Sequence, residues 1–270
     1  MGPALTGAEL TEALGAGSAP PEGLRLVTLA ERPDLRAAVE AHNGSVWPTF
    51  MLEDPVAGRL WHHLYDDFAA FQAALVAPND RIAATLQSAP LAWDGTDDDL
   101  PDGWDDQFER TVAGLMPGPR PDTLGALQIV VSPERRGGGL AGLMVEAMRA
   151  IGRMRGDRAL IACVRPTDKE RYPLVAIERY AAWRRDDGLP FDPWIRLHVR
   201  LGGRIVRASP RSMTMTGSVA DWERWAGMAF PESGEYVVPR AAATVRIDRA
   251  ADRGTYHDPN VWVVHDLARP

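Results

Sequence analysis

The most chemically specific segment of the chain is a glycine-rich loop, PERRGGGLA, at residues 133–141. Three successive glycines at the start of a helix let backbone amides come close to a ligand. The unpaired N–H groups and the helix dipole favour an anion there, and a diphosphate is the expected ligand. A triple glycine also occurs in flexible turns, so the choice between turn and binding loop depends on the flanking elements.

Those flanking elements favour a binding loop. TLGALQIVVS (123–132) is a nearly continuous apolar run, typical of a strand buried on both faces. After the loop, apolar residues recur at helical spacing from Leu140 to Ile151, and Gly156 supplies a helix stop. ALIACV (159–164) is a second buried strand, so the segment predicts a strand, helix and strand crossover unit.

Two other phosphate-binding signatures are excluded. The loop lacks the GK[ST] ending of an ATP-type P-loop, and it does not show GxGxxG followed by an acidic ribose partner. Apolar periodicity and turn residues predict the remaining elements. They are a strand at 25–30, helices at 33–44 and 56–68, a hairpin at 71–93, helices at 105–115, 174–185 and 193–201, a strand pair at 202–209 and 212–217, and a helix at 219–228.

Composition narrows the class of protein further. Hydrophobic residues make up 45% of the 270 residues and charged residues 25%, as in globular proteins that fold around a core. The formal charge of -7 argues against nucleic acid as a partner. A single cysteine, Cys163, argues against disulfides and cysteine-rich metal sites and fits the cytoplasm. We expect no membrane span, because no apolar run approaches the required length of about 18 residues.

The glycine loop resembles the pyrophosphate motif of the GNAT acyltransferase superfamily, [Q/R]xxGx[G/A], which here spans Arg136 to Ala141. The resemblance covers roughly residues 24–216 and implies an α/β (α+β) fold with a mixed central sheet, splayed parallel strands and flanking helices. The implied organisation is a loosely ordered extension at 1–22, an acyltransferase domain at 23–217 with insertions at 94–122 and 165–192, and a C-terminal extension at 218–270 packed on the same domain.

The resemblance also implies acetyl-CoA, or another acyl-CoA, as co-substrate. The strands at 123–132 and 159–164 should splay, so that the pantetheine arm enters between them. Backbone groups in the first strand would bind that arm, and loop amides would bind the pyrophosphate. The implied cofactor-binding residues are Ile129, Val130, Val131, Arg136, Gly137, Gly138, Gly139, Leu140 and Ala141.

Candidate catalytic residues are fewer. GNAT enzymes usually protonate the leaving thiolate with the tyrosine of a YxxxG segment, and His198 stands at that position before Gly202. Histidine can act as general acid or polarise the sulfur, and a core histidine is the alternative. Gln128 cannot accept a proton but can orient the substrate or a water. Asp94 is the first candidate base, although aspartate before Gly95 is also common in turns. Transfer of the proton to bulk solvent is a further alternative.

Other residues carry weaker expectations. Cys163 lies within a strand and is expected to be a small buried hydrophobe. The histidines show no ligand spacing, so we expect no metal. Trp93 and Trp104 flank the acidic insertion and are candidates to line an acceptor pocket.

Transfer of an acetyl or other short acyl group from CoA to an amine of a small molecule is the leading hypothesis. A second copy of the chain is a candidate partner. One alternative is a CoA-binding sensor or assembly module without turnover. Another is an acyltransferase that uses a carrier protein or aminoacyl-tRNA as donor.

Overall fold

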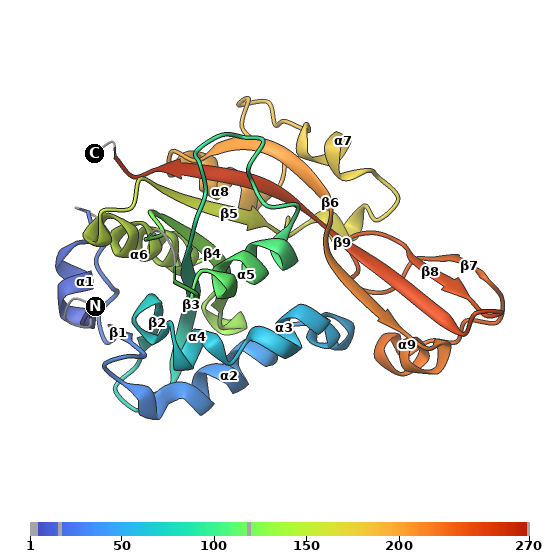
Figure 1. Cartoon of the computed structure of the whole chain (residues 1–270), viewed down its shortest axis with the longest axis horizontal. Helices are drawn as coiled ribbons and strands as arrows, with labels where there is room; N and C mark the ends of the chain where they lie inside the picture. The colour runs from blue at the N-terminus through green and yellow to red at the C-terminus, as the bar shows by residue number, and fades with distance from the viewer. Residues whose placement is uncertain (1–4, 16–17, 118–119, 269–270) are drawn as a thin grey trace.

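The computed structural model describes residues 5–15, 18–117 and 120–268, and their strands form one mixed sheet of nine strands (Figure 1). Eight strands follow the order β1-β2-β3-β4-β5-β9-β8-β7, and β6 pairs with β9. The strands are β1 Arg25–Thr28, β2 Gln72–Val76, β3 Ile82–Leu91, β4 Thr123–Val131, β5 Ala159–Val164, β6 Arg204–Gly217, β7 Gly234–Tyr236, β8 Val245–Asp248 and β9 Arg253–Asp266.

The pairing of β4 with β5 is parallel and short. The ladder runs from Thr123 to Ala126 on β4 and from Ala159 to Ala162 on β5, and both strands then continue apart. A bulge places Leu127 as an extra residue, because successive residues of β3 pair with Ala126 and Gln128. Bulges bend a strand and increase its twist. The splayed strands expected from the sequence are therefore confirmed, with the bulge beside the point of divergence.

Helices cover both faces of the sheet. On one face, α6 packs against β3, β4 and β5 and contacts α1 and α8; α2 to α5 lie on the opposite face. Helix α8 begins where Asp192 Oδ1 accepts from Trp194 N, and α6 ends at Gly156 with φ +79°. The helices are α1 Gly7–Glu12, α2 Arg36–Gly44, α3 Pro55–Leu60, α4 His63–Asp66, α5 Trp104–Ala113, α6 Leu140–Arg155, α7 Ile177–Ala181, α8 Pro193–Arg200 and α9 Val219–Ala226. Short 3-10 helices are η1 Pro33–Leu35, η2 Thr49–Glu53, η3 Ala69–Phe71, η4 Pro133–Arg135 and η5 Lys169–Arg171.

The strand pair predicted at 202–209 and 212–217 is wrong. Most of these residues form one 14-residue strand, β6. A register shift between Ser209 and Met213 accommodates Pro210, which has no N–H to donate. The antiparallel partner of β6 is β9, which also pairs with β5 and so lies inside the sheet. The last strand of the expected C-terminal extension therefore belongs to the central sheet. Beyond the core, β6 and β9 continue into an arm that carries α9, β7 and β8 (Figure 1).

Two predicted helices are shorter or broken. The helix expected at 56–68 divides into α3 and α4, because the ladder tightens where Leu64 N donates to Trp61 O. The helix expected at 174–185 is reduced to α7. There Phe191 N donates to Trp183 O, and the two rings pack edge to face at 5.5 Å. Packing of these aromatic side chains outweighs helix propensity in this segment.

The start of the chain is more ordered than expected. Helix α1 buries Leu10 completely, and Thr28 Oγ1 donates to Leu5 O at 2.8 Å. Residues 1–4 and 16–17 of the expected extension, 118–119 of the first insertion and 269–270 lie outside the described residues.

A buried pair of carboxyl groups connects α3, α5 and β6. Asp54 Oδ1 accepts from Ala57 N at the start of α3, and Asp105 Oδ2 accepts from Thr214 N at 3.0 Å. Their other oxygens, Asp54 Oδ2 and Asp105 Oδ1, are buried without another partner among the described residues. Burial, and then the charge of Asp54, raises the pKa of Asp105 to about 8. The two side chains therefore share a proton at neutral pH.

This shared proton makes stability depend on pH. Because the folded-state pKa of Asp105 is raised from 3.8, the folded protein holds a proton that the unfolded chain releases. Stability should therefore fall as pH rises between about 4 and 8. We expect Asp105→Asn to remove this loss, which amounts to roughly 4 kcal/mol over three pH units, so that the Tm of the variant rises relative to wild type by roughly 8–16 °C between pH 5 and pH 9.

Thermal unfolding at both pH values measures the effect, and Asp98→Asn, an exposed carboxylate of the same insertion, is the control. A difference between Asp105→Asn and wild type that is equal at both pH values would contradict the shared proton.

Candidate active site

A cavity of about 1330 Å³ passes through the gap between β4 and β5. On one side, its wall is formed by the glycine loop, the start of α6 and α8. On the other, it is formed by residues from α2 to α3, by Trp104 of α5 and by Met213 of β6. We call these the donor side and the acceptor side.

The donor side exposes an unpaired strand edge. Ser132 N donates to Ala83 O, so Ser132 directs its backbone toward β3. Backbone direction alternates along an antiparallel ladder, so Val130 also faces β3, whereas Ile129 and Val131 face the gap. Since β5 has diverged here, the N–H and C=O groups of these two residues are placed to pair with an extended ligand, as the pantetheine arm requires.

The glycine loop leads directly from this edge into α6. Gly137 and Gly139 have φ of +82° and +80°, a left-handed region that favours glycine. The first hydrogen bond at the start of α6 runs from Leu143 N to Gly139 O at 3.2 Å. The N–H groups of Leu140 and Ala141 lie before it and have no partner within the helix. Arg136 is exposed and lines the cavity. This constellation fits a pyrophosphate at the end of a bound pantetheine arm.

His198 lies on the donor side, in α8, and lines the cavity. Its Nδ1 is 2.9 Å from Nε2 of His265 on β9, and its ring packs edge to face on Trp194 at 4.6 Å. Burial, followed by the neighbouring His265, lowers the pKa of His198 to about 3. The imidazole is therefore neutral at physiological pH.

The acceptor side is aromatic and contains polar atoms without partners. The rings of Trp47, Trp61 and Trp104 line it. Trp93, the other candidate for an acceptor pocket, is not part of this wall, and its Nε1 donates to Thr96 O. Gln128 Oε1, Asn43 Nδ2 and Trp47 Nε1 are buried without a hydrogen-bond partner among the described residues, and all three residues line the cavity. Buried polar atoms are normally paired, so these atoms indicate where a polar ligand binds.

Charged side chains of both signs also line the cavity. Arg165 follows β5, and Arg240 lies between β7 and β8; Glu40 and Glu170 are the acidic members. Sequence reasoning missed all four, because single charges in helices and loops carry no local signal. The contact between Arg165 and Asp258, for example, joins residues 93 positions apart.

Cys163 is a buried packing residue beside the gap and is not a nucleophile. Its Sγ lies 3.1 Å from Ser212 Oγ, which also accepts from Trp104 N, while Trp104 Nε1 donates to the carbonyl of the bulge residue Leu127. Burial raises the pKa of the Cys163 thiol to about 12, so it stays protonated. This agrees with its expected role as a small buried residue.

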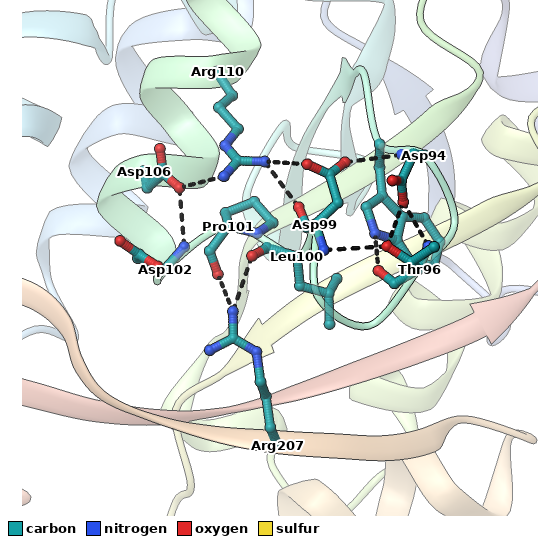
Figure 2. Close-up of polar contacts among 10 residues, drawn as sticks. Asp94, Thr96, Asp99, Leu100, Pro101, Asp102, Asp106, Arg110 and Arg207 are labelled. Atoms are coloured by element: carbon teal, nitrogen blue, oxygen red, sulfur yellow. Dashed lines mark hydrogen bonds and ion pairs between the residues drawn. The ribbon is translucent and has the colours of Figure 1, made fainter.

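Asp94 is not brought to the cavity, which argues against its predicted role as base. Its Oδ1 accepts from the backbone N and Oγ1 of Thr96, both at 2.7 Å, in an exposed loop (Figure 2). Nearby, Arg110 pairs with Asp99 and Asp106, and Arg207 donates to backbone carbonyls of the same loop. Asp94, Asp99 and Asp106 thus accept from backbone N–H groups of their own loop, which is the turn alternative for aspartate.

The splayed strands, the glycine loop and the cavity between them define a CoA-dependent acyltransferase. No family model matches the sequence. The chain is 33% identical over 278 residues to arginine N-acetyltransferase avaD of Aspergillus versicolor, covering 92% of this chain and 95% of that protein. The chain belongs to the GNAT N-acetyltransferase superfamily, and it transfers an acyl group from CoA to an amine of a small molecule.

Solved structures share the fold. The loading GNATL domain of CurA from Lyngbya majuscula aligns with a TM-score of 0.57 and 17% identity, covering 92% of this chain and 98% of that domain. The GphF GNAT-like decarboxylase in complex with isobutyryl-CoA aligns with a TM-score of 0.55 and 18% identity, covering 90% and 98%. Among the described residues, no helix is long and apolar enough to span a membrane, and no group of three His, Cys, Asp or Glu side chains could hold a metal ion.

The backbone of Gly139 provides a test of the loop. We expect Gly139→Ala to weaken CoA binding about tenfold, because a non-glycine residue at φ +80° costs about 1–2 kcal/mol and would shift the amides out of position. Isothermal titration with CoA measures the change.

Gly156→Ala is the matched control for this loop. It lies at the other end of α6 and outside the cavity wall, has nearly the same φ of +79°, and has no atom within 4 Å of an added Cβ. Equal CoA affinities of the two variants would contradict the role of the left-handed turn.

Proposed function

We propose that the chain acetylates the α-amine of arginine, or of a close guanidino amino acid, with acetyl-CoA as donor. The observation that carries this proposal is the acceptor side of the cavity, where aromatic rings, charges of both signs and unpaired polar atoms meet. An acceptor with a cationic end and a carboxylate matches such a wall better than an apolar amine does. The arginine N-acetyltransferase activity named for the relative from Aspergillus versicolor supports the same choice.

The chemistry of arginine selects the α-amine as nucleophile. A guanidinium has a pKa above about 12 and stays protonated, whereas an α-amino group is far less basic and loses its proton more readily. The protonated guanidinium can instead interact with Glu170 and with the faces of the cavity tryptophans, whereas Glu40 already pairs with Arg36. These contacts would hold the far end of the acceptor while its amine faces the gap.

Residues on both sides of the gap support the transfer. Gln128 presents an unpaired Oε1, which can accept a hydrogen bond from the attacking amine and direct its lone pair. The new C–N bond forms as the C–S bond breaks, and the amine proton leaves through water, since Gln128 cannot hold it. Proton loss to solvent was one of the alternatives left open by the sequence.

His198 acts in this proposal as a neutral hydrogen-bond donor. In this proposal, the proton of the neutral His265 lies on Nε2 and is donated to His198 Nδ1, which is the tautomer that the donor role of His198 requires. His198 then carries its own proton on Nε2, on the donor side where the sulfur leaves. Its lowered pKa argues against the imidazolium form that a general acid would need.

An acceptor panel tests the proposed function. Purified protein should consume acetyl-CoA with arginine and yield acetyl-arginine by mass spectrometry, with a kcat/KM at least about tenfold above that for lysine or ornithine, since losing the planar guanidinium costs about 1.4 kcal/mol or more. If CoA raises the Tm but arginine is not acetylated, arginine is not the acceptor. A sensor without turnover would bind CoA and acetylate none of the panel.

Replacing His198 tests its role. We expect His198→Ala to lower kcat about 10- to 100-fold while the KM for acetyl-CoA changes little, because a donor to the developing thiolate is lost. His198→Tyr should recover part of the rate, since a phenol restores a donor.

The pH profile of the wild-type protein separates a neutral donor from a general acid. A protonated histidine acting as general acid would lose activity as pH rises through its pKa. Because the pKa of His198 is lowered to about 3, kcat should show no such loss between pH 5 and 8. A falling limb near pH 6.5 that disappears in His198→Tyr would contradict the neutral donor.

A further inference from the structure

Arg240 is a cation on the cavity wall without a carboxylate partner among the described residues. Its Nη2 donates to the backbone carbonyl of Val46, in the segment between α2 and η2. Arg240 also adopts φ +67°, a left-handed conformation that is uncommon outside glycine and costs of order 1 kcal/mol. Backbone strain of this kind clusters at ligand-binding sites.

Arg165 fixes the position of Arg240. Its Nη2 donates to Arg240 O at 3.0 Å, and its Nε lies 2.9 and 3.1 Å from the two carboxylate oxygens of Asp258. Asp258 is fully buried and also accepts from Tyr256 Oη at 2.6 Å. The charge of Arg165 is therefore balanced inside the protein, and the charge of Arg240 remains available to the cavity.

Both arginines lie on the acceptor side. Arg165 lies over the ring of Trp47 at 5.9 Å, and Trp47 packs on the same cluster as Trp104 and Cys163. The glycine loop leads into α6, which packs in the cluster on the opposite face of the sheet. An anion at Arg240 would therefore belong to the acceptor and not to the pyrophosphate of CoA.

Two further side chains with buried donors line the same cavity. Asn43 is 4% exposed, and its Oδ1 accepts from Thr85 Oγ1. Its Nδ2 makes no hydrogen bond of good geometry among the described residues, although its side chain lies near the hydroxyl of Tyr65. Trp47 Nε1 is likewise buried and unpaired. Both residues flank Val46, whose carbonyl receives Arg240, and both line the cavity. A carboxylate accepts several hydrogen bonds and would satisfy such donors together.

We propose that Arg240, positioned by Arg165 and assisted by Asn43 and Trp47, binds the α-carboxylate of the amino-acid acceptor. This inference rests on the proposed function and adds the group that distinguishes an amino acid from a simple amine. The guanidinium suits the task because its planar fork can donate two hydrogen bonds to one carboxylate. Binding the carboxylate here would hold the neighbouring α-amine at a fixed place relative to Gln128.

The test compares arginine with argininamide, which keeps the α-amine and the guanidinium but lacks the negative charge. We expect the wild-type protein to prefer arginine by about 10- to 100-fold in kcat/KM, the range for hydrogen bonds to a charged group. Arg240→Gln should abolish this preference, chiefly by raising the KM for arginine, while activity with argininamide stays within about twofold. Arg240→Lys, which keeps the charge but loses the fork, should be intermediate.

Arg246→Gln, an exposed position on β8 of the same arm, is the control and should retain the preference. If wild type uses arginine and argininamide equally, the carboxylate site is wrong while the proposed function stands. If Arg240→Gln lowers activity with both acceptors equally, Arg240 is structural and the inference fails. If wild type acetylates neither compound, the proposed function fails and the inference with it.

Discussion

The site depends on one constraint, which is that the backbone groups freed where β4 and β5 separate must find other partners. The carbonyl of the bulge residue Leu127 accepts from the indole of Trp104, and the far edge of β5 stays paired with β9 through Val164. Among the described residues, Ile129 and Val131 have no strand partner on the side of the gap, so their backbone groups are available to a ligand. The gap is thus stabilised by α5 and β9 on either side of it, and the binding edge is what remains.

The two sides of the gap are built differently. The donor side is nearly continuous in sequence, from the edge of β4 through the glycine loop into α6, and its contacts are mostly backbone. The acceptor side collects side chains from α2, α5, β5 and the arm, held by long-range contacts such as that between Arg165 and Asp258. The donor is therefore recognised mainly by backbone groups, and the acceptor mainly by side chains.

This difference explains what the sequence could predict. The loop from Arg136 to Ala141, the bounds of β5 and the place of His198 follow from local periodicity, glycine spacing and family resemblance. The pairing of β6 with β9 could not be predicted in this way, because 35 residues separate the two strands and Pro210 is a residue that usually ends a strand. That Asp94 lies outside the cavity wall could not be predicted either, because the position of its loop relative to the cavity is set by folding. The partners of Arg240 become visible only after folding.

The strands β7 and β8 lie at the end of the sheet, and the segment that carries Arg240 connects them. Connections between edge strands tolerate substitution and insertion better than a strand buried in the middle of a sheet. Substitutions in the segment between β7 and β8 can therefore change the acceptor in related proteins, while the β4 edge, the glycine loop and α6 stay the same. Diversification of substrate and conservation of donor then occur in separate stretches of the gene.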